Sequence, residues 1–255
     1  MKKPAAAFLA ILSFALLSAA TQAQQPEEGT PENPAIASQD AILKAHPIPM
    51  TDVRLTGGPL QHAQQLDAKY LLELEPDRML AYLRERAKLQ PKAKPYGGWD
   101  GAGRQLTGHI AGHYLSAVSL MYAATGDVRF KERADYMVAQ LKEVQDAQGD
   151  GYIGAQLDGK GGDGKISFQE LSKGIIRSGG FDLNGLWSPW YVEHKIFAGL
   201  RDAYRYTGNQ TALEVEIKFA RWVQGILAPL DDIGSFNLVF ETHQAVIPAP
   251  HVHGG

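Results

Sequence analysis

The chain of 255 residues contains no cysteine. This absence excludes disulfide bonds, thiolate-ligated metal sites and a cysteine nucleophile from the chain. Strong charge of either sign is also missing, because the formal net charge is only −3. A chain with so small a net charge has no electrostatic field that favours nucleic acid or an anionic membrane. We therefore expect no nucleic-acid partner and no membrane partner.

Long apolar runs are scarce, with one exception near the N-terminus. The segment Phe8–Leu17 is largely apolar, follows Lys2 and Lys3, and precedes small residues that end at Ala23. The run is too short for a transmembrane helix, and this order is typical of a signal peptide. The sequence predicts a signal peptide over residues 1–23, export to the periplasm or the exterior, and a flexible Gln-, Glu- and Pro-rich leader over 24–50.

One helical phrase occurs twice. His113–Asp127 reads HYLSAVSLMYAATGD and Lys195–Asn209 reads KIFAGLRDAYRYTGN. Aligned on Thr125 and Thr207, the two phrases lie 207 − 125 = 82 residues apart. A repeat on this scale indicates a fold of stacked units, each a helix, a Thr-Gly turn and a second helix.

The spacing of apolar residues places these helices. It predicts two helices between residues 57 and 89 that break near Pro76, and a helix over 108–124 that is buried on most sides. The next helix has one exposed side, where charged residues such as Arg133 and Glu143 face water. A second pair occupies residues 190–227, and a Gly-rich loop of about forty residues, 147–186, separates the two units.

A buried helix paired with a half-exposed helix, repeated, is typical of the inner and outer rings of a helical toroid. It would also suit an α-solenoid. We expect an all-α fold, a partial (α/α)6 toroid, over residues 51–230. Residues 231–255 show no helical period and are interpreted as an irregular tail from truncation. A partial ring would leave one apolar helix face uncovered, which favours association.

Histidine and aromatic residues mark the candidate site. His109 and His113 share one helix face, but the sequence shows no third metal ligand, so no metal site is predicted. A pocket role and a structural role both stay open for this pair. His194 follows a tryptophan-rich segment that includes Trp190, at the expected start of a buried helix. There histidine can bind sugar hydroxyls while tryptophan stacks on a sugar ring, although an aromatic helix cap is the alternative.

Carboxylates that could serve catalysis are few. Glycosidases need two paired carboxyl groups or a carboxyl acid with another nucleophile. Asp100, Asp182 and Glu193 are the candidates, and the sequence does not place any two within reach, so catalytic residues stay unassigned. Asp182 could cap a helix or point into the pocket. The segment Asp163–Glu170 copies half of a calcium-binding loop but lacks the leading carboxylates, so a flexible surface loop is the alternative.

Two long phrases resemble a known family. The segments GWDGAGRQLTGHIAGHYLSAVSLMYAATGD and GFDLNGLWSPWYVEHKIFAGLRDAYRYTGN are similar to the N-terminal half of the β-L-arabinofuranosidase-like glycoside hydrolases of family 127. The resemblance runs from about Val53 to Pro229. It implies an (α/α)6 toroid followed by β-sandwich domains, and retaining hydrolysis of arabinofuranosides from plant glycans.

The resemblance also implies which groups act. In the family a cysteine near a zinc ion is the nucleophile and a glutamate is the acid/base, all in the later half. This chain has no cysteine, so we expect no cofactor in it and no activity of the chain alone. His194 carries over by its place in the Trp-Tyr-x-x-His-Lys phrase, and Trp99, His109 and Trp190 do so more loosely. With Asp182 these form the expected carbohydrate-binding set.

Two other function classes stay open. A polysaccharide lyase or a sugar epimerase of the same toroid would pair a Tyr or His base with a cation that neutralises a uronate. Arg104 and Arg177 are the loop candidates for that cation. The third possibility is a non-catalytic, carbohydrate-binding helical repeat.

Overall fold

A computed structural model describes residue 45 and residues 47–230. The chain divides into the units Met1–Pro47 and Ile48–Gly255, and every helix and strand below belongs to the second unit. The predicted signal peptide, nearly all of the predicted leader and the predicted tail over 231–255 lie outside the described residues.

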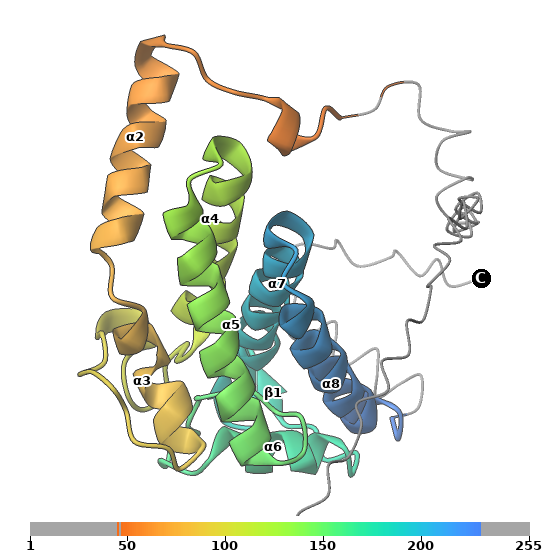
Figure 1. Cartoon of the computed structure of the whole chain (residues 1–255). Coiled ribbons are helices and arrows are strands. Elements are labelled where there is room, and N and C mark those ends of the chain that lie inside the picture. Colours follow the sequence, from red (N-terminus) through yellow and green to blue (C-terminus); the bar gives the residue numbers. More distant parts are fainter. Residues whose placement is uncertain (1–44, 46, 231–255) are drawn as a thin grey trace, which may run out of the picture. The chain divides into compact units, whose positions relative to one another are not determined.

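The described residues are mostly helical and form seven α-helices, two short 3-10 helices and three two-residue strands. Their order along the chain is η1 (Met50–Asp52), α2 (Gly58–Glu73), α3 (Pro76–Arg86), η2 (Gly98–Asp100), α4 (His109–Thr125), α5 (Val128–Gln148), α6 (Gly164–Leu171), β1 (Ser178–Gly179), β2 (Asp182–Leu183), β3 (Leu186–Trp187), α7 (Pro189–Thr207) and α8 (Gln210–Leu227). Helices α4, α5, α7 and α8 run alongside one another, and α6 and the strands lie at one end of them (Figure 1).

Two glycines let α4 and α7 pack backbone against backbone. A Cβ atom at Gly112 would lie 2.1 Å from the carbonyl oxygen of Lys195, and one at Gly199 would lie 2.7 Å from the carbonyl oxygen of Gly112. A real side chain cannot occupy such a space without moving a helix. The close α4–α7 contact is therefore built on these glycines, and it brings the first turns of both helices together.

The predicted repeat is confirmed in the turns between the paired helices. Helices α4 and α7 both end at a glycine with a left-handed backbone, Gly126 and Gly208. The following helices both start with a side-chain cap, in which Asp127 accepts a hydrogen bond from the backbone N–H of Arg129 at 3.0 Å and Asn209 accepts one from Ala212 at 2.9 Å. Each Thr-Gly turn thus satisfies the free backbone groups at both helix ends.

The predicted loop over residues 147–186 is only partly a loop. It contains helix α6, the antiparallel strands β1 and β2, and the first residue of β3, so the all-α expectation needs this small correction. The segment Asp163–Glu170, for which the sequence leaves a calcium-binding loop or a flexible loop open, belongs to α6 instead. Asp163 is the N-cap of this helix and accepts a hydrogen bond from the backbone N–H of Lys165 at 3.0 Å. The described helices do not display a closed ring.

Charged residues of α5 do not all face water, contrary to expectation. Arg133 is half-buried and donates hydrogen bonds to the carbonyl oxygens of Leu72 and Leu74, at 2.9 and 2.6 Å, and to the hydroxyl of Tyr114 at 3.1 Å. These carbonyls lie at the C-terminal end of α2, where the last helical oxygens lack partners within the helix. Arg133 therefore joins α5 to the turn between α2 and α3.

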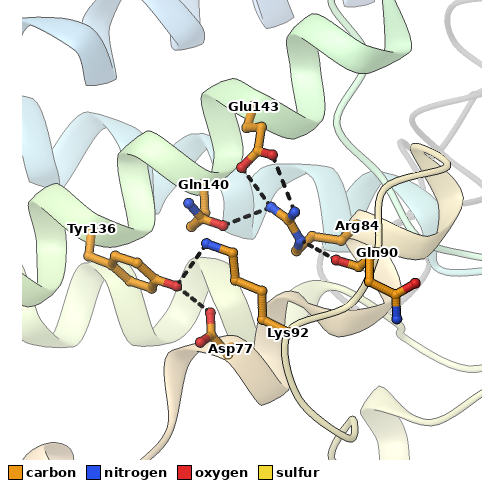
Figure 2. Close-up of polar contacts among 7 residues, drawn as sticks. All are labelled: Asp77, Arg84, Gln90, Lys92, Tyr136, Gln140 and Glu143. Atoms are coloured by element: carbon orange, nitrogen blue, oxygen red, sulfur yellow. Dashed lines mark hydrogen bonds and ion pairs between the residues drawn. The ribbon is translucent and has the colours of Figure 1, made fainter.

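A polar network fastens α3 to α5 (Figure 2). The side chain of Arg84 is 5% exposed and donates hydrogen bonds to the carbonyl oxygen of Gln90 at 2.9 Å, to Gln140 at 2.8 Å and to both carboxylate oxygens of Glu143 at 2.7 and 3.2 Å. Asp77 and Lys92 complete the network through the hydroxyl of Tyr136. We call this set of seven residues the α3–α5 network.

Helix α2 is the least buried α-helix among the described residues. It has no buried residue, and Leu60, Leu66 and Tyr70 expose 69%, 54% and 60% of their surfaces. This agrees with the expectation that part of the helical assembly leaves apolar surface uncovered. In the part of the chain that the structure describes, no helix combines the length and apolarity needed to cross a bilayer.

Candidate functional site

A pocket of about 610 Å³ lies at the N-terminal end of α7. Its walls come from the η2 turn, the loop that leads into α4, the β2–β3 hairpin region and the first turns of α7. The lining residues are Trp99, Leu106, Phe181, Trp187, Ser188, Trp190, Tyr191 and His194. Three indole rings thus share one hollow with a phenol and an imidazole, and a volume of this size is typical of small-molecule sites.

The turn that carries Trp99 is held at several points. The carbonyl oxygen of Trp99 accepts a hydrogen bond from the backbone N–H of Leu106 at 2.8 Å, and the hydroxyl of Thr107 donates to the carbonyl oxygen of Gly101 at 2.6 Å. Asp100 accepts a hydrogen bond from the backbone N–H of Gly108, the N-cap of α4, at 2.8 Å. These bonds fix the backbone on both sides of the indole.

Gln156 connects two walls of the pocket. Its side-chain amide is buried and donates to the carbonyl oxygens of Gln105 at 3.0 Å and of Trp187 at 2.8 Å. The ring of Trp187 meets that of Trp99 edge to face, with centroids 6.0 Å apart. Arg104 lies over the Trp187 ring, 5.9 Å from its centroid. The two indoles therefore form one corner, which we call the indole corner.

Buried amide hydrogen bonds also hold the hairpin region. Asn184 accepts a hydrogen bond from the backbone N–H of Arg177 at 2.7 Å and donates to the carbonyl oxygens of Ile175 and Ser167 at 2.9 and 3.3 Å. Ser188 directly precedes Pro189, the first residue of α7. It has a left-handed backbone with φ of 44°, and its backbone N–H donates a hydrogen bond to the carbonyl oxygen of Phe181 at 2.7 Å. A strained conformation at a non-glycine residue persists where the surroundings hold it, often beside a binding site.

Tyr191 and His194 of the lining belong to a group of imidazole and phenol rings that extends to His113 and His109 beside the pocket, and we call this group the imidazole side. The Nε2 atom of His113 lies 3.0 Å from the hydroxyl of Tyr191, and the rings of His109 and His113 meet edge to face with centroids 5.6 Å apart. The ammonium of Lys195 lies 4.8 Å from the centre of the Tyr191 ring. His194, one helical turn after Trp190, lines the pocket itself.

Two imidazoles on this side, those of His109 and His113, have lowered pKa values. Burial, followed by the proximity of His113 and Lys195, lowers the pKa of His109 to about 4. Burial also lowers the pKa of His113, with Lys195 and His194 as the next causes. A neutral imidazole offers one donor and one acceptor, which matches the hydroxyl groups of a neutral ligand.

The three candidate carboxylates do not converge in the pocket. The carboxyl of Asp100 caps α4, because it accepts a hydrogen bond from the backbone N–H of Gly108. Burial raises its pKa to about 7, although the backbone N–H groups of Gly108 and Ile110 act in the opposite direction. Asp182 forms an ion pair with Arg104 and is not among the residues that line the pocket, so its part in sugar binding stays a prediction. Neither carboxyl is placed as a catalytic acid or nucleophile.

Glu193 is buried on α7, one residue before His194, which lines the site. It is 1% exposed, and both of its carboxyl oxygens lack a hydrogen-bond partner among the described residues. Burial raises its pKa well above the ordinary value, which favours the neutral, protonated form. The described structure also gives no partner to Nδ1 of His109 or to Nε1 of Trp190. Unsatisfied groups of this kind are rare in proteins and often mark sites that bind a ligand or water.

The residues present do not fit the zinc ion that the family resemblance implies. The chain has no cysteine, and within residues 45 and 47–230 no group of three or more His, Cys, Asp or Glu side chains could hold a metal ion. Among the described residues, His109 and His113 belong to no group of three candidate ligands. We therefore derive no chemical step through a metal here.

The sequence predicted part of the pocket. Trp99, Trp190 and His194 line it, and His109 lies beside it, with its ring centroid 5.9 Å from that of Tyr191. The predicted set lacked five lining residues, Leu106, Phe181, Trp187, Ser188 and Tyr191. The signal for Tyr191 was its position four residues before Lys195 and three before His194, on the exposed side of α7. No local signal identifies Phe181, because its place depends on the fold of the hairpin.

One comparison with known proteins gives a match. The family model described as beta-L-arabinofuranosidase, GH127 catalytic domain, matches residues 52–246, which include every α-helix and strand described above. A comparison with curated proteins finds no similar sequence.

Proposed function

Because the chain belongs to the β-L-arabinofuranosidase catalytic-domain family of glycoside hydrolases, we propose that its pocket binds the arabinofuranosyl groups of plant-type glycans. We propose further that the described helices are part of the (α/α)6 toroid that this family implies. The observation that carries the binding proposal is the union of three indoles with a phenol and an imidazole in one pocket of about 610 Å³.

The chemistry of the pocket suits a neutral sugar. The C–H face of a furanose ring is apolar and can stack on an indole, while its hydroxyl groups need donors and acceptors. His194 and the hydroxyl of Tyr191, which His113 contacts at 3.0 Å, supply such groups. Because the pKa of His109 is lowered to about 4, its imidazole carries little positive charge at neutral pH, and the one ammonium described on this side, that of Lys195, lies over the ring of Tyr191.

Binding is the step that this chain's own residues support. A retaining mechanism needs a nucleophile and an acid/base group at the sugar. The chain has no cysteine, and no carboxylate is among the residues that line the described pocket. We therefore propose that this chain holds and orients the arabinofuranosyl group but does not hydrolyse the bond on its own.

The arrangement of the arginines argues against a lyase. A lyase would need a cation free to neutralise a uronate carboxylate. Arg104 is paired with Asp182, and Arg177 is paired with Glu170. Both candidates are therefore already neutralised by carboxylates of the chain.

Isothermal titration of the chain with methyl β-L-arabinofuranoside tests the proposal. We expect saturable binding, and the His194→Ala variant should weaken it roughly tenfold, as expected for the loss of a hydrogen bond at a partly buried site. The matched control is His62→Ala, an exposed histidine on α2 outside the pocket lining, which should bind as the parent does. Absence of binding, or equal loss in both variants, would contradict the proposal.

Hydrolysis is measured in the same samples with a chromogenic β-L-arabinofuranoside. We expect binding without release of the chromophore. Turnover by the chain alone would show that it holds catalytic groups that we do not assign.

We propose that the protein is exported. The support is the order of Lys2 and Lys3, the apolar segment Phe8–Leu17 and the small residues before Ala23. N-terminal sequencing of the secreted or periplasmic protein tests this, with Gln24 as the expected first residue. A retained N-terminus or a cytoplasmic product would contradict it.

A further inference from the structure

A smaller pocket lies where the C-terminal end of α5 and the loop after it meet α8. Its volume is about 300 Å³, at the lower end of the range of small-molecule sites, which suits a ligand of one sugar ring. We call it the α5–α8 pocket, and it shares no lining residue with the pocket at the N-terminal end of α7. Apart from two glycines, its lining is polar or charged and consists of Gln145, Asp146, Asp150, Lys218 and Arg221.

The buried wall of this pocket holds a polar atom without a partner. Gln145 is 2% exposed, and its Nε2 atom donates hydrogen bonds to the carbonyl oxygens of Gly151 and Val215, both at 3.0 Å. These two bonds fix the amide, so its oxygen is an acceptor with a set position. This oxygen has no hydrogen-bond partner among the described residues. A ligand hydroxyl group that donates to it would remove the cost of a buried, unsatisfied acceptor.

The loop that forms one wall is packed against α8. Gly151 has φ of 99°, and a Cβ atom added to it would lie 2.7 Å from the carbonyl oxygen of Lys218, so a side chain does not fit there. Asp150 holds the same turn, because it accepts a hydrogen bond from the backbone N–H of Tyr152 at 3.2 Å. The pocket is therefore preformed, and a ligand that enters it does not have to order the loop.

The two carboxylates of the pocket are each neutralised by a lysine that is not part of the lining. Asp146 forms an ion pair with Lys142, one helical turn before it on α5. Asp150 forms an ion pair with Lys165 of α6, at 2.9 Å. These pairs leave the cations of the lining to decide the charge that a ligand meets.

The cations of α8 give the pocket a positive charge. Lys218 and Arg221 lie three residues apart and so project from one side of the helix. The ammonium of Lys218 lies 3.4 Å from Asp146, which Lys142 already neutralises. Arg221 is exposed and has no ion-pair partner among the described residues. A small anion can therefore bind here without displacing a carboxylate of the chain.

We propose that the α5–α8 pocket is an accessory site that binds a sugar acid, a pyranose ring that carries one carboxylate. The carboxylate bonds with the guanidinium of Arg221, whose planar fork matches it, and with the ammonium of Lys218. A ring hydroxyl group donates to the free oxygen of Gln145. An anion without hydroxyl groups leaves this oxygen unsatisfied, and a neutral sugar leaves the guanidinium without a partner.

Isothermal titration with three ligands tests both parts of this recognition. The ligands are methyl α-D-galacturonide, its neutral analogue methyl α-D-galactoside, and acetate, which keeps the charge but has no hydroxyl group. We expect the galacturonide to bind roughly tenfold more tightly than either of the others, because each of these lacks one set of contacts. Added salt should weaken this binding, since the cations are exposed. Saturating methyl β-L-arabinofuranoside should not compete, because the two pockets share no lining residue.

Variants of exposed arginines locate the site. Arg221→Gln should weaken galacturonide binding roughly tenfold, and Arg221→Lys should weaken it less, because it keeps the charge and loses the fork. The matched control is Arg205→Gln at the end of α7, which removes the same charge from an exposed position outside the pocket and should change binding less than about twofold. Unchanged thermal unfolding verifies that each variant is folded. The side-chain amide signals of Gln145 in NMR spectra should shift with the galacturonide and not with acetate.

The outcomes decide the proposal without reference to the pocket at α7. Tight galacturonide binding that depends on Arg221 and not on Arg205 supports it. Equal binding of galactoside or acetate, or equal loss in the two glutamine variants, overturns it. Absence of galacturonide binding, or its displacement by methyl β-L-arabinofuranoside, overturns it as well.

Discussion

Two buried polar regions of this molecule follow opposite rules. In the α3–α5 network, the guanidinium of Arg84 bonds with Gln90, Gln140 and Glu143 (Figure 2). Beside the pocket, the described structure gives no hydrogen-bond partner to the carboxyl of Glu193, to Nδ1 of His109 or to Nε1 of Trp190. The first region satisfies its central charge, and the second leaves several polar groups unsatisfied.

The difference separates structural groups from groups available for binding. A satisfied buried network rigidifies the fold, whereas each unsatisfied group costs about 1–3 kcal/mol of stability. Proteins keep such costs mainly where function requires them. We therefore expect substitutions in the α3–α5 network to lower stability, and some substitutions beside the pocket to raise it.

The largest effect should come from the helix contact on which the pocket depends. Gly112→Ala would place a Cβ atom 2.1 Å from the carbonyl oxygen of Lys195, so α4 and α7 must separate. We expect a loss of about 3 kcal/mol or more in the free energy of unfolding, measured by urea denaturation.

The matched control for this change is Gly225→Ala in α8. No atom lies within 4 Å of a Cβ added there, and alanine is the better helix former. This variant should gain about 0.5–1 kcal/mol. If the two glycine substitutions change the free energy of unfolding equally, α4 and α7 do not pack as closely at Gly112 as the structure shows.

A loss of about 2–4 kcal/mol is expected for Arg84→Met. The variant keeps most of the apolar stem but leaves Gln140 and the carbonyl of Gln90 without their buried donor. Lys218→Met, which removes the exposed ion pair with Asp146, should cost less than about 1 kcal/mol. Equal losses of unfolding free energy in the two variants would show that the buried α3–α5 network stabilises the fold no more than an exposed ion pair does.

Glu193→Leu should increase stability by about 1–3 kcal/mol at pH 7, because it removes a buried carboxyl that has no partner in the described structure. The pKa of Glu193 is raised, so the folded state keeps its proton while the unfolded chain ionises above its ordinary pKa of 4.5. The wild type therefore loses stability as pH rises above that value, and the leucine variant does not.

Denaturation curves at several pH values measure this difference. The advantage of the leucine variant should grow from pH 4.5 upwards. A leucine variant that is less stable than wild type at every pH would mean that Glu193 has a structural partner.

The smallest effect at pH 7 belongs to His109→Gln, because this histidine is mostly neutral at pH 7 in both states. Its pKa falls from 6.5 to about 4 on folding. The stability that depends on the neutral form is present above pH 6.5 and is lost as pH falls towards 4. As pH falls across this range, the unfolding free energy of the variant should therefore rise relative to that of the wild type. A constant difference from pH 7 to 4 would contradict the lowered pKa.

Local patterns predicted much of the fold. Apolar spacing located α2 to α5, α7 and α8, and the Thr-Gly turns predicted both pairs, because these features depend on residues within a few positions of one another. The α3–α5 network was missed since Arg84 and its partners on α5 are 56 and 59 residues apart in sequence. No periodicity reports such a contact.

The site divides in the same way. The phrase around Trp190 and His194 placed both residues at the pocket, since both lie within one helix start. The pairing of Asp182 with Arg104, 78 residues away, required the fold and removed Asp182 from the expected lining. The sequence also did not predict the burial of Glu193. Its neighbours Val192 and His194 give opposite indications, since the first is buried and the second is exposed.

The central claim is that the pocket of Trp99, Trp187 and Trp190 binds an arabinofuranosyl group. The four tryptophan indole N–H signals of the chain, followed by NMR during titration with methyl β-L-arabinofuranoside, test this most directly. We predict shifts for the pocket tryptophans, with Trp190 prominent because its Nε1 has no partner in the described structure, while the buried Trp222 stays in place as an internal reference. Unchanged pocket signals at saturating sugar, or an equal shift of Trp222, would contradict the account.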